Sequence, residues 1–233
     1  LEGVANRIGY TADGLCHRDS NGHWRRLQLD GVEAGDTLEL IGGDRDDTLA
    51  ASGELSGVIT MELRGAGGDD VLSGGDDLEG GDGDDVLSQA YVSAQISGGA
   101  GEDTIVVGSG DVSIDGGDDT DTILIEGTTG GDQIDVVQPD SSTLQHAVDG
   151  VFGVAASSET DLITNVEVVR IESGAGADMV RVAHGDAIGS SVRMDVDGGG
   201  PDANDWLGVV DSGLGDLVLH RIDLDGASGA VHV

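Results

Sequence analysis

The stretch 80–124 contains three successive blocks that begin with the same phrase: GGDGDDVLS at 80, GGAGEDTIV at 98 and GGDDTDTIL at 116. The blocks are 18 residues apart, and each places a glycine pair and a short polar turn before an aspartate at the sixth position, namely Asp85, Asp103 and Asp121. A β-branched or aliphatic pair follows each aspartate. A fixed repeat of this size is typical of a chain that stacks small units rather than folding around one centre.

The same phrase recurs on both sides of this stretch. GGDRDDTLA at 42 and GAGGDDVLS at 65 precede it, with Asp47 and Asp70 at the sixth position. Asp70 and Asp85 are 15 residues apart rather than 18, because the unit GGDDLE at 74 is short. We therefore expect the stack to bend or shift there. Weaker copies follow at 127, 173 and 198, with sixth-position or equivalent residues Asp132, Asp178 and Asp205.

Composition limits how such a chain can fold. The 233 residues include 42 Gly but only one Phe, two Trp and two Tyr, which is too little bulk for a conventional globular core. Hydrophobic residues make up 37 % of the chain and are mostly Val, Leu, Ile and Ala. Small branched side chains suit a thin interior between narrow sheets, where they stack rung upon rung. The sequence therefore predicts an all-β solenoid.

We expect three parts along the chain. Residues 1–39 hold four of the ten Arg and the single Cys, and they alternate like strands around the turn signals Asn21-Gly22 and Asp30-Gly31. This segment is expected to be a β-rich N-terminal cap made of hairpins, because the open edge of a stack must be covered. Residues 40–126 hold the regular repeats. Residues 127–233 are expected to be a degenerate continuation of the solenoid or a second β subdomain.

The charge of the chain is extreme. It has 46 acidic residues against 10 basic ones, all of them Arg, for a net charge of −36. Self-repulsion on this scale opposes a compact state unless cations are bound. It also argues against nucleic acid as a partner, since that would require a basic face. Adaptation to high salt would not explain acids at one fixed repeat position. No apolar run reaches the length of a membrane span.

The repeated turn has the chemistry of a calcium site. Glycine pairs permit the positive φ angles of a tight turn and leave carbonyl oxygens unshielded, and the aspartate adds a hard anionic oxygen. Ligands that are all oxygen favour Ca²⁺ over transition metals. One turn has too few oxygens, but two turns stacked at strand spacing can enclose an ion. Only one half of each 18-residue coil contains the Gly-Asp turn, so the carboxylates are expected on one side of the stack.

GGDGDDVLS at 80 resembles the nonapeptide G-G-x-G-x-D-x-U-x of the RTX (repeats-in-toxin) family and matches it at every specified position. The resemblance is specific over 42–125 and weaker over 127–210. It implies a right-handed parallel β-solenoid of the β-roll type, with Ca²⁺ between turns held by sixth-position aspartates and glycine-turn carbonyls. Carried over by position, it predicts as ligands Asp47, Asp70, Asp85, Asp103 and Asp121, with Asp44, Asp82 and Asp118 at the third position as helpers.

The weaker copies extend the predicted calcium set. Asp132 and Asp178 are included in it because each keeps the sixth position of its copy. A solvated Asp-Gly turn explains Asp132, Asp178 and Asp205 equally well. A second cluster, Cys16, His17 and His23, has no fourth ligand, so we interpret it as exposed loop residues rather than a transition-metal site. The neighbouring Arg18, Arg25 and Arg26 are expected to pair with carboxylates.

These features predict a calcium-stabilised structural module of a secreted or cell-surface protein that serves adhesion, matrix or fibre assembly. Expected partners are calcium ions and either a second copy joined head to tail or a glycan or protein surface. The alternative is a non-catalytic calcium-binding part of a secreted protease, lipase or polysaccharide-modifying enzyme, which RTX repeats often accompany. The chain has no H-E-x-x-H and no G-x-S-x-G motif, so we expect no enzyme activity from it.

Overall fold

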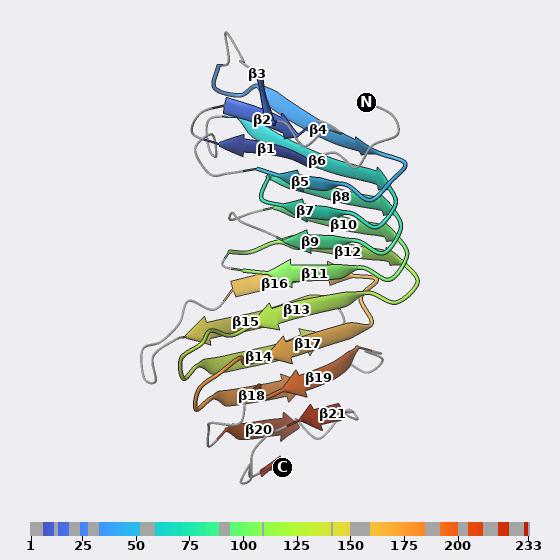
Figure 1. Ribbon diagram of the computed structural model, residues 1–233. Helices are drawn as coiled ribbons and strands as arrows, with labels where there is room; N and C mark the ends of the chain where they lie inside the picture. Colours follow the sequence, from blue (N-terminus) through green and yellow to red (C-terminus); the bar gives the residue numbers. More distant parts are fainter. Residues whose placement is uncertain are drawn as a thin grey trace. The chain divides into compact units, whose positions relative to one another are not determined.

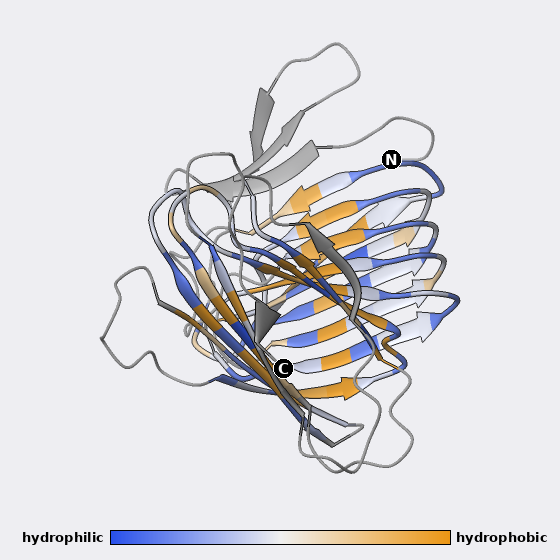
Figure 2. Ribbon diagram, turned by 90° about the horizontal axis from the view of Figure 1, so that it is seen from below, coloured by the Kyte–Doolittle hydropathy of each residue, from blue (hydrophilic) through white to orange (hydrophobic). Residues whose placement is uncertain are grey.

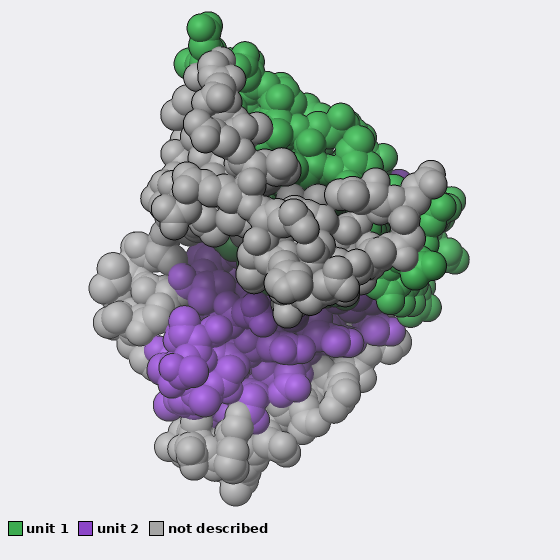
Figure 3. Space-filling view, turned by 45° about the horizontal axis from the view of Figure 1, so that its top comes forward, with its two compact units in different colours: residues 1–121 green, residues 122–233 purple. Residues whose placement is uncertain are grey.

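The structure is a computed structural model in which the chain runs through a series of short strands (Figure 1). In the strands before residue 33 and after residue 208, the backbone alone is described. Two compact units are distinguished, Leu1–Asp121 and Thr122–Val233 (Figure 3). The described residues are 7–11, 14–18, 24–27, 33–51, 59–88, 94–108, 110–140, 142–149, 159–184, 192–199, 205–211, 219–223 and 231–232.

The first unit contains a sheet of five parallel strands and a second sheet that is parallel except at its end. In the five-strand sheet the order is β12 (Ser113–Asp118), β10 (Gln95–Ala100), β8 (Asp77–Asp82), β6 (Thr60–Gly67) and β4 (Thr37–Gly43). In the second sheet, parallel strands β11 (Thr104–Val107), β9 (Val86–Ser88), β7 (Val71–Ser73) and β5 (Thr48–Ala50) are followed by β1 (Arg7–Thr11), β2 (Gly14–Arg18) and β3 (Trp24–Leu27). Successive strands from β4 to β12 alternate between the two sheets.

This alternation confirms the prediction of an all-β chain and is consistent with a β-solenoid. All the elements that the described residues form are strands. Strand β1 pairs in parallel with β5 and antiparallel with β2, and β2 pairs antiparallel with β3. The hairpin expected around Asn21-Gly22 is therefore confirmed by its two strands. The hairpin expected at Asp30-Gly31 is wrong, because β3 and β4 belong to different sheets.

Two rows of aliphatic side chains fill the interior of the first unit. Leu49, Leu72, Leu87 and Ile105 are in register on β5, β7, β9 and β11, and all are fully buried. A second row on the five-strand sheet runs Leu40, Leu63, Leu78, Ile96 and Ile114. The alternation of hydrophobic and hydrophilic residues along the strands is visible in Figure 2. The core is thus one side chain deep from each sheet, as the shortage of aromatic residues predicts.

The short repeat at 74 does not shift the register of the stack. Strand β8 pairs with β6 from Glu62 opposite Asp77 onward, and with β10 from Asp77 opposite Gln95. The three missing residues are absorbed in the connection 74–76, which leads from β7 to β8. There the backbone N–H of Met61 donates to Asp76 Oδ2 at 2.8 Å, and the backbone N–H of Asp76 donates to the Met61 carbonyl at 2.8 Å. The expected offset is therefore wrong, since the loss lies in a link between sheets.

The second unit also has two sheets. One contains parallel strands β21 (Leu219–Asp223), β19 (Arg193–Asp197), β17 (Val168–Glu172) and β13 (Thr122–Glu126). The other contains β22 (Val231–His232), β20 (Trp206–Asp211), β18 (Met179–His184), β14 (Gln133–Asp140), β15 (Thr143–Asp149) and β16 (Glu159–Thr164).

An inserted hairpin explains the long interval between Asp132 and Asp178. Strands β14, β15 and β16 pair antiparallel in sequence, and β14 then pairs in parallel with β18. The chain thus returns to the next parallel position only after two extra strands. The described part of the chain contains no helix long and apolar enough to cross a membrane.

Two neighbouring residues of β9 test the inward-outward alternation. Leu87 is 0 % exposed, whereas Val86 on the opposite face is 38 % exposed. We expect Leu87→Ala to lower the free energy of unfolding by about 2–5 kcal/mol because it leaves a cavity in the aliphatic row. Val86→Ala should cost less than about 1 kcal/mol. Urea unfolding of both variants measures the difference, and equal losses would contradict the assigned faces.

Candidate metal centre

The Gly-Asp turns of the first unit all connect a strand of the five-strand sheet to the next strand of the other sheet. The first four lead from β4 to β5, β6 to β7, β8 to β9 and β10 to β11, and therefore stack along one side, and the fifth ends β12 and closes the unit at Asp121. Each turn buries its sixth-position aspartate immediately before the following strand. The exposed fractions of these residues are Asp47 3 %, Asp70 1 %, Asp85 1 %, Asp103 1 % and Asp121 0 %.

Backbone hydrogen bonds tie these aspartates into a ladder. The N–H of Asp47 donates to Asp70 Oδ1 at 2.6 Å, and the N–H of Asp70 donates to Asp85 Oδ1 at 2.7 Å. Asp85 N–H and Asp103 N–H continue the series to the Oδ1 atoms of Asp103 and Asp121 at 2.8 and 2.9 Å. Each carboxylate thus holds the turn before it at strand spacing, so the row stabilises the stack directly.

A second ladder at the fifth position was not predicted. The N–H of Asp69 donates to Asp46 Oδ1 at 3.2 Å, and the N–H of Asp84 donates to Asp69 Oδ1 at 3.1 Å. Glu102 N–H donates to Asp84 Oδ1 at 2.9 Å. These carboxylates are exposed, and they bond to the turn after them, whereas the buried ladder bonds to the turn before. In the sequence these residues show only as an acid at positions five and six of four successive turns, which does not by itself indicate a hydrogen bond.

The glycines of the turn serve two different purposes. At the second and fourth positions they adopt positive φ, for example 122° at Gly81 and 130° at Gly83. The first-position glycine is needed for space instead. A Cβ at Gly80 would collide with Asp85 Oδ2 and with the carbonyl oxygen of Gly98 in the next turn. The same pair of oxygens, a carboxylate Oδ2 and a carbonyl of the next turn, flanks Gly65 and Gly98.

The second carboxylate oxygen has no hydrogen-bond donor in three of these turns. Oδ2 of Asp70, Asp85 and Asp103 is buried without a partner, and no cationic side chain among the described residues pairs with these three. Burial raises the pKa of each carboxyl to about 6, against an ordinary 3.8. The next carboxylate in the row raises the pKa further, while the backbone N–H lowers it. An unpartnered buried anionic oxygen is costly, and either protonation or a positive group beside it would relieve that cost.

The row recurs in the second unit. Asp132 N–H donates to Asp178 Oδ1 at 2.9 Å, and Asp178 N–H donates to Asp205 Oδ1 at 3.0 Å. Asp132, Asp178 and Asp205 are 0 %, 1 % and 7 % exposed. The alternative of a solvated Asp-Gly turn is therefore wrong for all three. Asp132 differs from the first-unit residues, because both of its carboxylate oxygens have donors from Thr128.

The third-position acids lie apart from the buried row. The side chains of Asp44, Asp82 and Asp118 are exposed, and the carbonyl of Asp82 accepts a 2.8 Å hydrogen bond from Gly68 N–H. Their role as helper ligands stays a prediction. Among the residues described, no group of three or more His, Cys, Asp or Glu side chains is placed to hold a metal ion. The side chains of Cys16, His17, Arg18, Arg25 and Arg26, and the whole of His23, lie outside the described residues.

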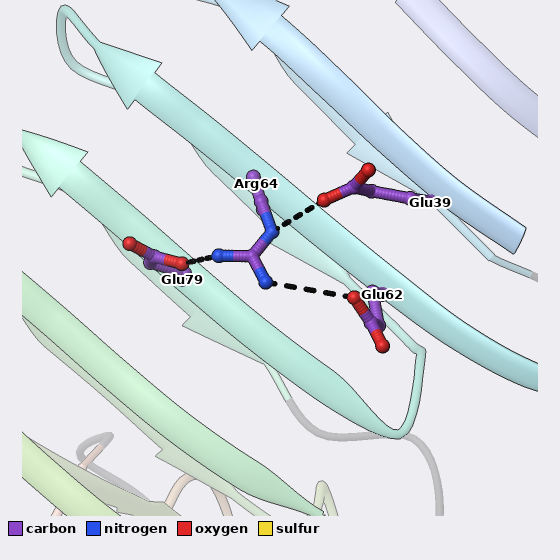
Figure 4. Close-up of polar contacts among 4 residues, drawn as sticks. All are labelled: Glu39, Glu62, Arg64 and Glu79. Carbon is purple, nitrogen blue, oxygen red and sulfur yellow. Dashed lines mark hydrogen bonds and ion pairs between the residues drawn. The ribbon is translucent and has the colours of Figure 1, made fainter. Parts of the chain in front are cut away.

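Arginine neutralises carboxylates elsewhere on the molecule. Arg64 on β6 reaches Glu39 on β4, Glu79 on β8 and Glu62 on its own strand (Figure 4). Its Nε lies 2.8 Å from Glu39 Oε1. Arg181 pairs with Asp135 at 2.7 Å and Arg193 with Asp195 at 3.0 Å. These pairs are all outside the buried aspartate row.

The second unit also contains a buried polar pair that the sequence did not indicate. His146 Nδ1 on β15 lies 3.1 Å from Asp161 Oδ2 on β16, and both side chains are buried. The two residues belong to the inserted hairpin, where no repeat marks them. The pair joins neighbouring antiparallel strands.

The donor set of the first unit fits a hard cation. All the groups around the first-position glycine are oxygens, one anionic and one a carbonyl dipole from the next turn. No cluster of three side-chain ligands is present among the described residues, so any coordination shell there would have to include main-chain carbonyls or water. Nitrogen or sulfur ligands are not part of this oxygen set, which excludes the usual environments of zinc and copper.

No protein-family model matches the chain, and no curated protein is significantly similar to it in sequence. The resemblance to RTX repeats therefore depends on the nonapeptide alone.

A glycine substitution tests the crowding in the turn. We expect Gly80→Ala to destabilise the fold by about 1–3 kcal/mol or more, because its Cβ would overlap Asp85 Oδ2 and the Gly98 carbonyl. Gly67→Ala is the matched control, since its Cβ would meet nothing closer than 3.8 Å. Urea unfolding in calcium and in chelator measures both. Equal stability of the two variants would contradict the described turn geometry.

The raised pKa values predict an unusual pH dependence in chelator. Because the folded pKa of Asp70, Asp85 and Asp103 is about 6 and the ordinary value is 3.8, the folded state binds more protons within this range. The stability that these three carboxyls contribute is fully present below pH 3.8, where they are protonated in both states. It is lost as the pH rises through about 6, where the buried carboxyls ionise. We therefore expect the urea midpoint of the first unit in chelator to rise as pH falls from 7 to 5. A midpoint that falls over this range would contradict the raised pKa values.

Proposed function

We propose that this chain is a calcium-stabilised structural module of a secreted or cell-surface protein, built as a right-handed parallel β-roll. In this proposal Ca²⁺ lies between successive Gly-Asp turns of the first unit. Asp70, Asp85 and Asp103 hold it through Oδ2, together with main-chain carbonyls of the neighbouring turns. The module serves adhesion, matrix or fibre assembly and has no catalytic role.

The observation that carries this proposal is the row of buried Oδ2 atoms without donors. A Cβ on Gly80 would collide both with Asp85 Oδ2 and with the Gly98 carbonyl oxygen of the following turn, so the two oxygens line the same position. A buried anionic oxygen there is costly unless a proton or a cation lies near it. The raised pKa of Asp85 has the same cause, because the buried carboxylate can lose its uncompensated charge only by taking up a proton.

The geometry of these oxygens favours Ca²⁺ over Mg²⁺. Calcium accepts six to eight oxygens in flexible arrangements and takes carbonyls readily, whereas Mg²⁺ requires a near-ideal octahedron and retains its waters. The row offers carboxylates in a repeating arrangement with one carbonyl set per turn, so successive ions would lie about one strand spacing apart. The net charge of −36 supports the binding of several divalent ions.

Charge and expected affinity support an extracellular setting. Sites with few carboxylates and many neutral carbonyls bind Ca²⁺ with dissociation constants of about 0.1–1 mM, as extracellular modules do. Such sites fill outside cells and remain empty at cytosolic calcium concentrations. Binding to the folded state alone raises its stability by mass action, so several weak sites together stabilise the stack substantially.

The structural role follows from what the acids contact. The Oδ1 atoms of the buried row and the exposed fifth-position carboxylates accept backbone hydrogen bonds from adjacent turns. Both sets connect turn to turn along the stack. Cation binding at Oδ2 would therefore stabilise the same connections that hold the two sheets in register.

A calcium titration of the full chain tests the proposal. We expect β-structure by circular dichroism and the melting temperature to rise with calcium in the millimolar range and to fall in excess chelator, with saturable binding heat in calorimetry. Magnesium at the same concentration should produce a smaller rise. An identical melting temperature in chelator and in millimolar calcium would refute calcium stabilisation.

Paired substitutions separate the buried row from the exposed third position. Asp85→Asn should weaken calcium binding, because it removes the anionic Oδ2. In chelator the same variant should be at least as stable as the parent chain, since the amide can donate where the carboxylate cannot. Asp82→Asn, two turn positions before Asp84 and exposed, should change calcium affinity less. If Asp82→Asn lost as much affinity as Asp85→Asn, the helper ligands would share the site equally.

A further inference from the structure

We propose that side-chain hydroxyls take the place of the cation in the second unit. Thr128 supplies Asp132 with the hydrogen-bond donors that the second carboxylate oxygens of the first unit lack, and Ser173 stands in the next turn where its hydroxyl would do the same for Asp178. The second unit then keeps its turns without calcium, and cation dependence is confined to the first unit. The part of this inference that concerns the first unit rests on the proposed function, whereas the role of the two hydroxyls does not.

Thr128 provides donors for both oxygens of Asp132. Its backbone N–H donates to Asp132 Oδ2 at 2.6 Å, and its hydroxyl lies 2.9 Å from Oδ1 and 3.0 Å from Oδ2. Asp132 is 0 % exposed, so these bonds are made to a carboxylate removed from water. The same hydroxyl accepts a 3.1 Å hydrogen bond from Gly130 N–H, which fixes its orientation within the turn.

Ser173 is placed to do the same for Asp178. It stands at the first position of the next turn, where the first unit has glycine, and its side chain is fully buried. Ser173 Oγ and Asp178 Oδ2 are both buried without a hydrogen-bond partner, so each has a free bonding position within the same turn. Burial raises the pKa of Asp178, whereas the Asp132 N–H and then the Ser173 hydroxyl lower it.

The first unit has no hydroxyl at the corresponding positions. Its five turns begin Gly42-Gly43, Gly65-Ala66, Gly80-Gly81, Gly98-Gly99 and Gly116-Gly117. Where a hydroxyl would have to stand, a Cβ on Gly65, Gly80 or Gly98 meets the carboxylate itself. The first unit therefore has glycine and an uncompensated carboxylate where the second unit has a side-chain hydroxyl.

The two units are therefore expected to respond differently to calcium. A hydroxyl donor compensates a buried carboxylate at any calcium concentration, whereas a bound ion does so only when calcium is present. At low calcium the second unit would remain folded while the turns of the first unit open. The second unit would thus be a permanent scaffold, and the first unit a calcium-dependent stack.

Hydrogen exchange of the full chain measures the two units separately. In chelator, we expect amides of β14, β17 and β18 to remain protected and those of β6, β8 and β10 to exchange quickly. Added calcium should protect the second group and leave the first nearly unchanged. If β14, β17 and β18 lose protection in chelator together with the first unit, the proposed independence of the second unit is wrong.

Three variants test the hydroxyls themselves, all in chelator. Thr128→Val keeps the shape and the backbone bond but removes the hydroxyl, and it should speed exchange in β14 and β18 roughly tenfold or more. Ser173→Ala should do the same for β17 and β18. Thr129→Val is the matched control, because Thr129 is the exposed next residue of the same turn and should leave exchange unchanged. Exchange in Thr128→Val equal to that in Thr129→Val would overturn the assignment.

The outcomes distinguish this inference from the proposed function. If calcium changes exchange in neither unit but Thr128→Val still accelerates β14 and β18, the proposed calcium role fails and the hydroxyl role stands. If calcium protects the first unit but Thr128→Val and Ser173→Ala match the control, the calcium role stands and the hydroxyl role fails. Calcium protection of β14 and β18 in the parent chain would also overturn it.

Discussion

Asp70, Asp85 and Asp103 lie buried in the turn row of the first unit, and the fold provides a hydrogen-bond donor for one of the two carboxylate oxygens of each. The backbone N–H of the preceding turn satisfies Oδ1, as at Asp70 and Asp85. Stacking then places the next carboxylate about one strand spacing away, so the like charges accumulate along the row. The sheets, the thin aliphatic core and the one-sided turns all depend on how this accumulated charge is compensated.

The two units compensate their buried turn carboxylates in different ways. The first has glycine beside the carboxylate and keeps an oxygen-lined position that suits a hard cation. The second has Thr128 and Ser173 at positions where the first has glycine, and the Thr128 hydroxyl bonds to the carboxylate of Asp132. Exposed acids face a lesser problem because water screens them, and Arg64 shows that an arginine can bridge three of them across adjacent strands. Burial therefore decides where a cation matters.

The repeat predicted the sixth-position row because its period and its residue type coincide. It could not reveal the fifth-position ladder, since exposed acidic pairs such as Asp84 and Asp85 look the same whether they bond to the backbone or to water. The insertion of β15 and β16 was hidden because a hairpin adds strands without adding a Gly-Asp turn. The role of Thr128 was hidden for a related reason: in the sequence it is only a departure from the motif, whereas in the fold it contacts Asp132.

Anomalous diffraction from crystals grown in millimolar calcium tests the central claim most directly. The account predicts anomalous peaks in the first unit within coordination distance, about 2.3–2.6 Å, of the Oδ2 atoms of Asp70, Asp85 and Asp103. Main-chain carbonyl oxygens of adjacent turns should complete the shell around each peak. Ordered turns with no peak beside these atoms, and with water or a proton as the only partner of Oδ2, would contradict it.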